Sequence, residues 1–281
     1  MTEHQTIRVR SREPVVLAKD FAAPRPETES ALRNVSLLDA TGALVASHVE
    51  LPRREDRALA TGVRRFLAGY RGFGSTGRLS GIENDAFTFG FAPASPMRQR
   101  FGCGPSRFDT DQPTAASALH ALAAAAWRFT LDQHPKVAEE QRRLAADIRP
   151  DWRLRSGDTV TPWTSGVVNR SASLPYHRDS GNVAGSWSAM IVLRQGMTGG
   201  ELHLPDLDRH LACDDLSLTV FNGQGTMHGV TPIHRTEGGG HRFSIVFYAK
   251  SAFLTAGSPQ DERSRAARRA TDSFQAPRDS Q

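Results

Sequence analysis

Residues 242–250 read RFSIVFYAK, and this stretch indicates how the C-terminal half of the chain folds. Side chains of a β-strand alternate between two faces, so one apolar face carries Phe243, Ile245 and Phe247. The other face begins with Arg242 and Ser244, two polar residues that are a poor choice for a purely structural strand. We therefore expect a strand that packs a core with one face and turns a guanidinium and a hydroxyl toward a pocket with the other.

Short β-rich runs precede this strand from residue 164 onward. Turns rich in glycine, asparagine and proline separate these runs, which cover residues 164–168, 187–193, 201–204 and 216–221. This spacing predicts an antiparallel sandwich or barrel. Before it, residues 113–148 show a helical period that is interrupted at His134-Pro135, which predicts two helices packed on the sheet.

The rest of the chain is expected to flank this core. Residues 1–112 contain short apolar runs, which indicate short strands and turns, and basic glycine-rich loops around one strand over residues 86–91. Residues 256–281 are polar and rich in arginine, which predicts a flexible tail. We therefore expect an N-terminal extension over residues 1–112, helices and the β-rich core over residues 113–255, and a tail over residues 256–281.

Composition places the chain among ordinary globular proteins. Its 281 residues are 38% hydrophobic and 23% charged, which argues against wholesale disorder, collagen and coiled coil. Cys103 and Cys213 are too few for a disulfide framework or a cysteine zinc site, and they favour a reducing compartment. We find no signal peptide and no apolar stretch of about 20 residues that would span a membrane. We expect a monomer without an obligate protein partner, cytoplasmic and nucleoid-associated in a bacterium or phage, or nuclear in a eukaryote.

The positive charge of the chain comes almost entirely from arginine. There are 35 basic and 30 acidic residues, a net charge of +5, and only three of the basic residues are lysines. This balance permits a polyanionic partner without demonstrating one. Residues 161–250 contribute seven basic and seven acidic residues, so the positive excess lies in the flanking segments. Those flanks are where phosphates of a nucleic acid would be met.

The tripeptide His177-Arg178-Asp179 lies in the β-rich half. In an extended segment residues i and i+2 point the same way, so this histidine and aspartate can converge on one ion. Alone, such a tripeptide is more often a surface turn. His228 follows 51 positions later, after strands that can return the chain to the same place. Considered alone, it would be interpreted as a histidine of the core. Together the three residues match the two-histidine, one-carboxylate triad of non-haem Fe(II) oxygenases.

Arg242 points to a dicarboxylate co-substrate beside this triad, the alternative being an ion pair at a strand edge. Fe(II) with two neutral histidines and one aspartate keeps one positive charge, and Arg242 adds a second. A guanidinium binds a carboxylate through two charge-assisted hydrogen bonds, and Ser244 offers another donor. 2-Oxoglutarate, a dianion at neutral pH, matches both ends, and O₂ would complete the reaction. Asn169 and Arg170 are candidates for its iron-chelating end.

These motifs resemble the TET/JBP family of Fe(II)/2-oxoglutarate dioxygenases, which oxidise the methyl group of 5-methylcytosine or thymine in DNA. The likeness covers residues 161–250 and rests on HRDSGN from His177, HGVTP from His228 and RFSIVFY from Arg242. It implies an α+β fold with a double-stranded β-helix core of the jelly-roll, cupin-like type. It also implies catalytic iron ligands at His177, Asp179 and His228, and a distal-carboxylate site at Arg242 and Ser244.

Other residues are candidates for contacts with DNA. By the resemblance, Asn182 contacts the flipped target base, although a turn asparagine is an equal alternative. Tyr248 lies on the same strand face as Arg242 and stacks on a base or simply packs. Lys250 stands where animal members have a base-contacting histidine, which leaves the target base open. Arg71 and Arg78 belong to the basic loops that would hold phosphates.

The leading hypothesis is oxidation of 5-methylcytosine in DNA to 5-hydroxymethylcytosine, with the target nucleotide extruded from the stack. One alternative is a thymine hydroxylase, or a 2-oxoglutarate oxygenase acting on a small molecule or a protein side chain, because one barrel supports many substrates. Another is a cupin-like protein that binds metal without turnover. The extent of oxidation and the preferred sequence context stay open.

Overall fold

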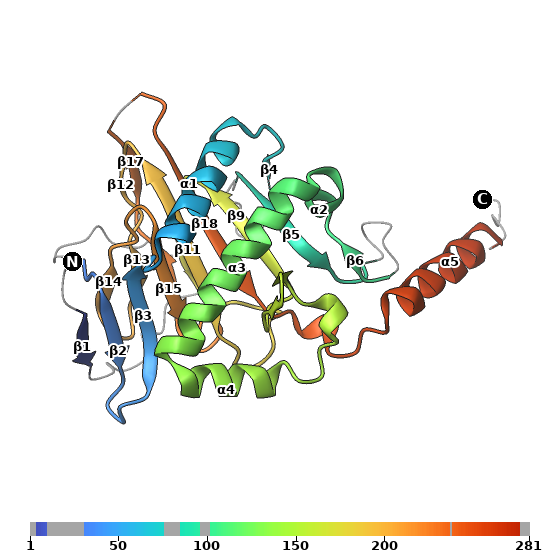
Figure 1. Ribbon diagram of the computed structural model, residues 1–281, viewed down its shortest axis with the longest axis horizontal. Helices are drawn as coiled ribbons and strands as arrows, with labels where there is room; N and C mark the ends of the chain where they lie inside the picture. The colour runs from blue at the N-terminus through green and yellow to red at the C-terminus, as the bar shows by residue number, and fades with distance from the viewer. Residues whose placement is uncertain (1–3, 10–30, 76–84, 96–101, 237, 276–281) are drawn as a thin grey trace, which may run out of the picture.

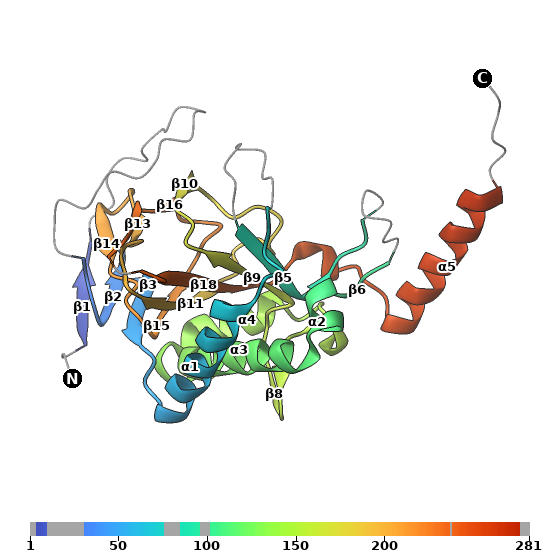
Figure 2. The ribbon, with the colours of Figure 1, turned by 90° about the horizontal axis from the view of Figure 1, so that it is seen from above.

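The computed structural model describes residues 4–9, 31–75, 85–95, 102–236 and 238–275 of the chain. These residues form two facing β-sheets, and helices cover the outer side of the larger sheet (Figure 1, Figure 2). Within these ranges, no helix is both long enough and apolar enough to cross a membrane. Arg78 lies outside the described residues.

The larger sheet has ten strands, in the order β1-β2-β3-β15-β11-β18-β9-β5-β4, with β6 paired to β5. Only β1 and β2 run parallel to each other; the other pairs are antiparallel. In chain order the strands are β1 (Gln5–Arg8), β2 (Val35–Leu38), β3 (Leu44–Glu50), β4 (Gly74–Ser75), β5 (Asp85–Ala92), β6 (Gly104–Pro105), β9 (Ser165–Arg170), β11 (Ser188–Gln195), β15 (Ser217–Phe221) and β18 (His241–Tyr248).

The smaller sheet has four strands in the order β10-β16-β13-β14. They are β10 (Leu174–His177), β13 (Leu202–Leu204), β14 (Arg209–Leu211) and β16 (His228–Val230). From β9 to β18 the chain passes back and forth between the two sheets, so that β15-β11-β18-β9 and these four strands form a double-stranded β-helix. The expected α+β fold with a jelly-roll core is confirmed. Two short pairs are β7 (Arg155–Ser156) with β8 (Thr159–Val160), and β12 (Met197–Gly199) with β17 (Ile233–Arg235).

Alternating side chains of the larger sheet separate two cores. Phe243, Ile245 and Phe247 of β18 are buried in the core shared with the helices. Met190 and Val192 of β11 are buried in the second core, between the sheets. Ser244 is the cross-strand partner of Val192, so the polar face of β18 also looks between the sheets. The packing face expected for residues 242–250 is thus confirmed, and each such apolar side chain contributes about 1.5–3 kcal/mol when fully buried.

Helices pack on the outer face of the larger sheet (Figure 1). They are α1 (Arg54–Gly69), α2 (Arg107–Asp111), α3 (Pro113–Gln133) and α4 (Pro135–Leu144). The predicted interruption between α3 and α4 is confirmed at His134. Pro135 has no backbone N–H with which to continue α3, but it fits the first position of α4.

The structure corrects two expectations about local structure. Helix α1 occupies a segment in which the sequence predicts short strands and turns. Its buried positions, Asp56, Ala60, Val63 and Leu67, follow a spacing of three to four residues that the surrounding arginines obscure. Helix α5 (Pro259–Gln275) occupies most of the segment expected to be a flexible tail. Ser258 begins it, because its hydroxyl accepts a hydrogen bond from the Asp261 N–H at 3.2 Å.

The boundary expected at residue 112 stays a prediction. Strands from the N-terminal part nevertheless lie in the same sheet as those that follow it. Strand β3 pairs with β15, and β5 pairs with β9, each over five positions. The N-terminal part therefore extends both sides of the sheet on which the candidate site is built.

Candidate functional site

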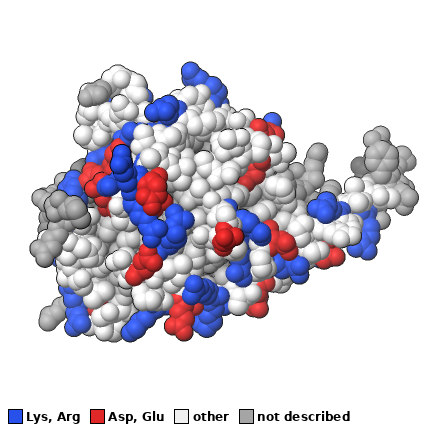
Figure 3. Space-filling view, in the orientation of Figure 1, with Lys and Arg blue, Asp and Glu red and all other residues white. Residues whose placement is uncertain are grey.

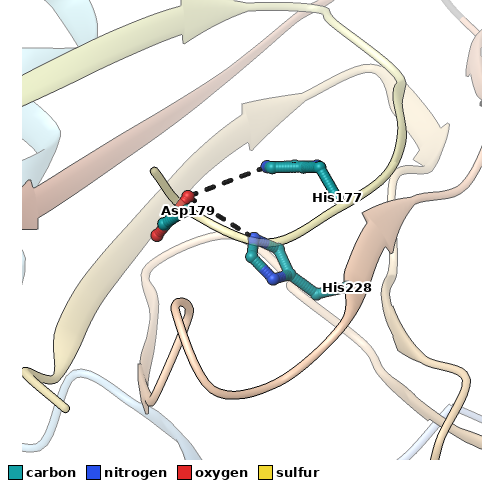
Figure 4. Close-up of side chains that lie close together, drawn as sticks. All are labelled: His177, Asp179 and His228. Carbon is teal, nitrogen blue, oxygen red and sulfur yellow. Dashed lines mark ion pairs between the residues drawn. The ribbon is translucent and has the colours of Figure 1, made fainter. Parts of the chain in front are cut away.

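His177, Asp179 and His228 lie together between the two sheets (Figure 4). His177 ends β10 and His228 begins β16, and the antiparallel pairing of these strands places the two histidines opposite each other. The Nε2 atoms of both histidines lie 3.8 Å from Oδ1 of Asp179. One ligand atom from each of the three residues lies within 4.8 Å of the others. The arrangement can therefore hold one metal ion on one side and leave its other side open.

Backbone carbonyls fix the orientation of both imidazoles. Nδ1 of His177 lies 2.9 Å from the Pro175 carbonyl, and Nδ1 of His228 lies 2.9 Å from the Thr226 carbonyl. Because a carbonyl oxygen only accepts hydrogen bonds, both Nδ1 atoms carry a hydrogen, so Nε2 is the ring nitrogen that each histidine can offer to a metal ion. Burial, aided by nearby His177, lowers the pKa of His228 to about 4, so this imidazole is neutral near pH 7.

The two loops that carry the triad are tied to each other. The Asp179 N–H donates to the Gly223 carbonyl at 2.9 Å, and the Arg178 guanidinium donates to the Gly225 carbonyl. Gln224 donates to the Asn182 carbonyl at 3.2 Å and accepts from the Gly185 N–H at 2.8 Å. These hydrogen bonds join the loop after β10, which carries Asp179, to the loop before β16, which leads to His228. They therefore fix the position of Asp179 relative to His228.

Arg242 is a buried cation with an unused donor. Its side chain is 1% exposed, one of its terminal N–H groups donates to the Gly200 carbonyl at 2.7 Å, and its Nε has no hydrogen-bond partner. Burial lowers its pKa. Among the described residues, no carboxylate lies within ion-pair distance of it. Because an unpaired buried charge is costly, this guanidinium fits an anionic ligand that enters between the sheets.

Ser244 and Asn169 lie beside Arg242 on the same inner face. They are cross-strand partners on β18 and β9, and the Asn169 amide donates to the Ser244 hydroxyl at 3.4 Å. Oδ1 of Asn169 is buried without a partner. Arg170 has a different position, since it forms an ion pair with Asp85 at 2.6 Å. Of the two upstream candidates, Asn169 therefore borders the buried cation, and Arg170 is already neutralised.

The Gly200 carbonyl that receives Arg242 is held by a turn and by Thr231. Gly199 and Gly200 adopt φ values of +74° and +77°, a region that favours glycine. The Thr231 hydroxyl accepts from the Gly200 and Glu201 N–H groups at 3.1 and 3.0 Å, and it donates to the Glu201 carboxylate. This network fixes the Gly200 carbonyl and thereby the position of the Arg242 guanidinium that donates to it.

Only some of the residues expected to contact a substrate lie near one another and near the triad. The Asn182 amide lies 3.5 Å from Asp179 Oδ2, and its backbone forms an isolated bridge with Lys250. The Lys250 ammonium lies 5.5 Å from the centre of the Tyr248 ring. Asn182 therefore borders the triad, Lys250 is joined to Asn182 through the backbone, and Tyr248 lies beside Lys250. Arg71 is exposed in the segment between α1 and β4, away from this group.

Sequence reasoning did not identify Gly200, Gly223 or Thr231. The glycine pair at 199–200 and the Asn222-Gly223 turn are visible as turn signals, and Thr231 lies in the HGVTP segment. Their partners, however, come from distant parts of the chain. No local pattern reveals which carbonyl meets Arg242 or Asp179.

The central part of the chain is similar to a known protein family. Residues 129–251 match the Tet_JBP family, the oxygenase domain of the 2OGFeDO superfamily. The bifunctional helicase and thymine dioxygenase JBP2 of Trypanosoma brucei brucei (strain 927/4 GUTat10.1) is 30% identical over 121 residues. These residues are 43% of this chain, and the chain spans only 10% of the length of that protein.

A solved structure with low sequence identity shares the fold. NgTET1 in complex with 5mC DNA has a TM-score of 0.60 and 12% identity, over 85% of this chain and 84% of that chain. An oxidoreductase of the 2OG-Fe(II) oxygenase family from Burkholderia pseudomallei has a TM-score of 0.47 and 13% identity, over 73% of this chain and 88% of that chain. The first likeness extends beyond the family match into the N-terminal part of the chain.

Proposed function

We propose that the chain is an Fe(II)- and 2-oxoglutarate-dependent oxygenase of the TET/JBP family, and that it oxidises the methyl group of 5-methylcytosine in DNA to 5-hydroxymethylcytosine. The observation that carries this proposal is the pairing of a preset His-Asp-His triad with a buried guanidinium whose Nε is unpartnered. The first fits Fe(II), and the second fits a carboxylate of 2-oxoglutarate.

Each residue of the site has a defined task in this proposal. His177 and His228 would hold Fe(II) through Nε2, and Asp179 would hold it through its carboxylate. Arg242 and Ser244 would bind the distal carboxylate of 2-oxoglutarate, and Asn169 borders that position. When bound, Fe(II) and 2-oxoglutarate supply O₂-dependent oxidation of a C–H bond, with release of succinate and CO₂. The buried apolar side chains between the sheets would exclude water from the end of the site near Arg242.

The DNA substrate is proposed from the relatives. NgTET1 is described in complex with 5mC DNA, and JBP2 is named a thymine dioxygenase. A methyl group on a base can reach an iron between two sheets only if the nucleotide leaves the base stack. Asn182 borders the triad, and together with Lys250 and Tyr248, which follow it in a chain of contacts, it would form the base pocket. The name of JBP2 makes thymine the second candidate base.

The experiment supplies the purified protein with Fe(II), 2-oxoglutarate, ascorbate and air, together with one of three substrates. These are a 5-methylcytosine duplex, the same duplex without modification, and free nucleosides. We expect 5-hydroxymethylcytosine from the first, detected by nucleoside mass spectrometry, with one succinate formed for each oxidised base. 5-Hydroxymethyluracil from the second would make thymine the target. Succinate formed with the free nucleosides but no oxidised base in either duplex would exclude the DNA function.

Two aspartate variants control this experiment. Asp179→Ala removes a proposed ligand, so no oxidised base should form. Asp158→Ala changes an exposed aspartate in the turn between β7 and β8, so oxidation should continue. Activity retained by Asp179→Ala would contradict the assignment of the triad.

A further inference from the structure

Helix α5 projects from the body of the molecule (Figure 1, Figure 2). Its 17 residues form a rod of about 25 Å, at 1.5 Å per residue. It lies beyond the segment that matches the family, which ends at residue 251. The family relationship therefore says nothing about its role.

The first turn of α5 is firmly attached to the body. Glu262 is 0% exposed and accepts hydrogen bonds from the Cys103 N–H at 2.8 Å and the Gly257 N–H at 3.0 Å. The Trp152 indole donates to the Gly257 carbonyl at 2.8 Å. The direction of the helix is consequently set by buried contacts at its first turn, and most of its described side chains beyond Glu262 are exposed.

The outer part of α5 is basic. Residues 263–271 read RSRAARRAT, with four arginines and no acidic residue. The side chains of Arg263, Arg268 and Arg269 are exposed, and within the described part of the chain they have no ion-pair partner. Figure 3 shows blue atoms along this arm, whereas blue and red are interspersed over the body. Among its described side chains α5 buries no apolar stripe, so packing against the body adds little to its stability beyond the first turn.

The path from the candidate site to α5 is short and fixed. Asn182 and Lys250 form a backbone bridge beside the triad, and the 3-10 turn Ser251–Phe253 follows directly. The Ser251 N–H and hydroxyl both donate to the Gly181 carbonyl, at 3.0 and 3.1 Å. Helix α5 begins at Pro259, only eight residues after Ser251. A long anionic polymer held at the triad would therefore lie within reach of this arm.

We propose that α5 is a DNA-binding arm whose outer arginines hold the phosphate backbone of the duplex next to the target nucleotide. The inference rests on the proposed DNA function. Arginine suits this task because its guanidinium keeps its charge and matches the geometry of phosphate oxygens. Such contacts carry no base information, so α5 adds affinity without sequence preference.

The test measures binding of a short unmodified duplex by fluorescence anisotropy from about 50 to 200 mM salt, without iron or 2-oxoglutarate. The variant R263Q/R268Q/R269Q keeps three good helix formers and removes three charges. Each lost phosphate contact flattens the plot of log affinity against log salt by about 0.9, so the slope should fall by about 2 to 3. At the lowest salt, we expect affinity to drop at least about tenfold.

The matched control removes three charges from helices on the far side of the larger sheet, as R65Q/K136Q/R143Q. These side chains are exposed on α1 and α4. The control should keep the wild-type salt slope, and circular dichroism should show both variants folded. Equal loss in both variants, or an unchanged slope in the α5 variant, would overturn the proposal. An α5 variant that binds DNA normally but loses self-association would instead make the arm a protein-binding element.

The two proposals fail separately. If the salt dependence of DNA binding changes in the α5 variant but no oxidised base forms in DNA, the proposed oxidation of DNA is wrong and the proposed DNA-binding role of α5 is supported. If the protein oxidises DNA and the α5 variant binds DNA like the wild type, only the proposed DNA-binding role of α5 is wrong.

Discussion

Gly223 illustrates how closely single atoms are fitted around the triad. Its carbonyl accepts the Asp179 N–H, and a Cβ on this residue would overlap Oδ2 of the same aspartate and lie 3.1 Å from the Phe221 ring. The Asp179 carboxylate can therefore lie where it does only because residue 223 has no side chain. Contacts that orient a metal ligand commonly change metal affinity by 10- to 100-fold when altered.

We predict that Gly223→Ala weakens metal binding by about tenfold or more, because the carboxylate of Asp179 must move away from the two Nε2 atoms. Titration with Co(II), followed by its visible absorption, measures the affinity. Gly62→Ala is the matched control, since a Cβ at that position on α1 meets nothing within 4 Å. Wild-type affinity in Gly223→Ala would show that the aspartate does not need its present position.

Arg242 carries the second prediction at this scale. Replacing it with glutamine removes the buried cation, so binding of 2-oxoglutarate should weaken by about 100-fold, in keeping with about 1.5–3 kcal/mol for hydrogen bonds to charged groups. Isothermal titration calorimetry on the Co(II) form, without O₂, gives the dissociation constant directly. Arg170→Gln is the control, because Asp85 already neutralises that arginine. If both variants bind 2-oxoglutarate equally well, Arg242 is not its partner.

At the scale of elements, the turn between β12 and β13 positions Arg242. Thr231, just after β16, holds this turn by accepting two backbone N–H groups and donating to Glu201. The Gly200 carbonyl, in turn, receives the guanidinium. A strand of the smaller sheet thus controls a side chain of the larger one.

We predict that Thr231→Val raises the dissociation constant of 2-oxoglutarate about tenfold, because valine keeps the shape but cannot accept or donate these hydrogen bonds. Thr231→Ser keeps the hydroxyl and should bind almost normally. Rescue by serine separates a positioning role from a general loss of packing. Metal affinity should stay the same in both variants, and a parallel loss of metal binding would contradict a role confined to Arg242.

At the scale of the whole molecule, the helices and both sheets form one packed unit. Leu67 of α1 is 0% exposed in the core that also contains Phe243 and Ile191 of the central strands. The N-terminal part of the chain therefore supports the face of β18 opposite to the one that carries Arg242. Unfolding of that part should release the metal site at the same time.

We predict that Leu67→Ala destabilises the protein by about 2–5 kcal/mol, because truncation leaves a cavity in this core. The melting temperature should fall by about 5–10 °C, and circular dichroism and the absorption of bound Co(II) should report the same transition. Arg65→Ala, exposed on the same helix, should shift it by less than about 0.5 kcal/mol. Separate transitions for the two signals would show that the N-terminal part folds independently of the site.

Local features of the sequence predicted much of the core. The alternation in residues 242–250 gave the correct packing face, and Pro135 marked the break between two helices. The alternation of side chains in the His-x-Asp tripeptide predicted that His177 and Asp179 would converge on one metal ion. Helix α1 was missed because its apolar spacing is short and lies among arginines. The C-terminal helix was missed because its composition is that of a solvated segment.

Local sequence was enough to predict the main strands of the C-terminal half, the break between α3 and α4, and the set of groups able to bind a metal and a dicarboxylate. These depend on side-chain period and on the chemistry of neighbouring residues, which local sequence contains. Only the tertiary structure decided that Gly223 makes room for Asp179, that Thr231 and Gly200 place Arg242, and that an arginine-rich helix stands clear of the body. Those contacts join segments far apart in the chain, and strand register, which no local pattern encodes, sets which atoms meet.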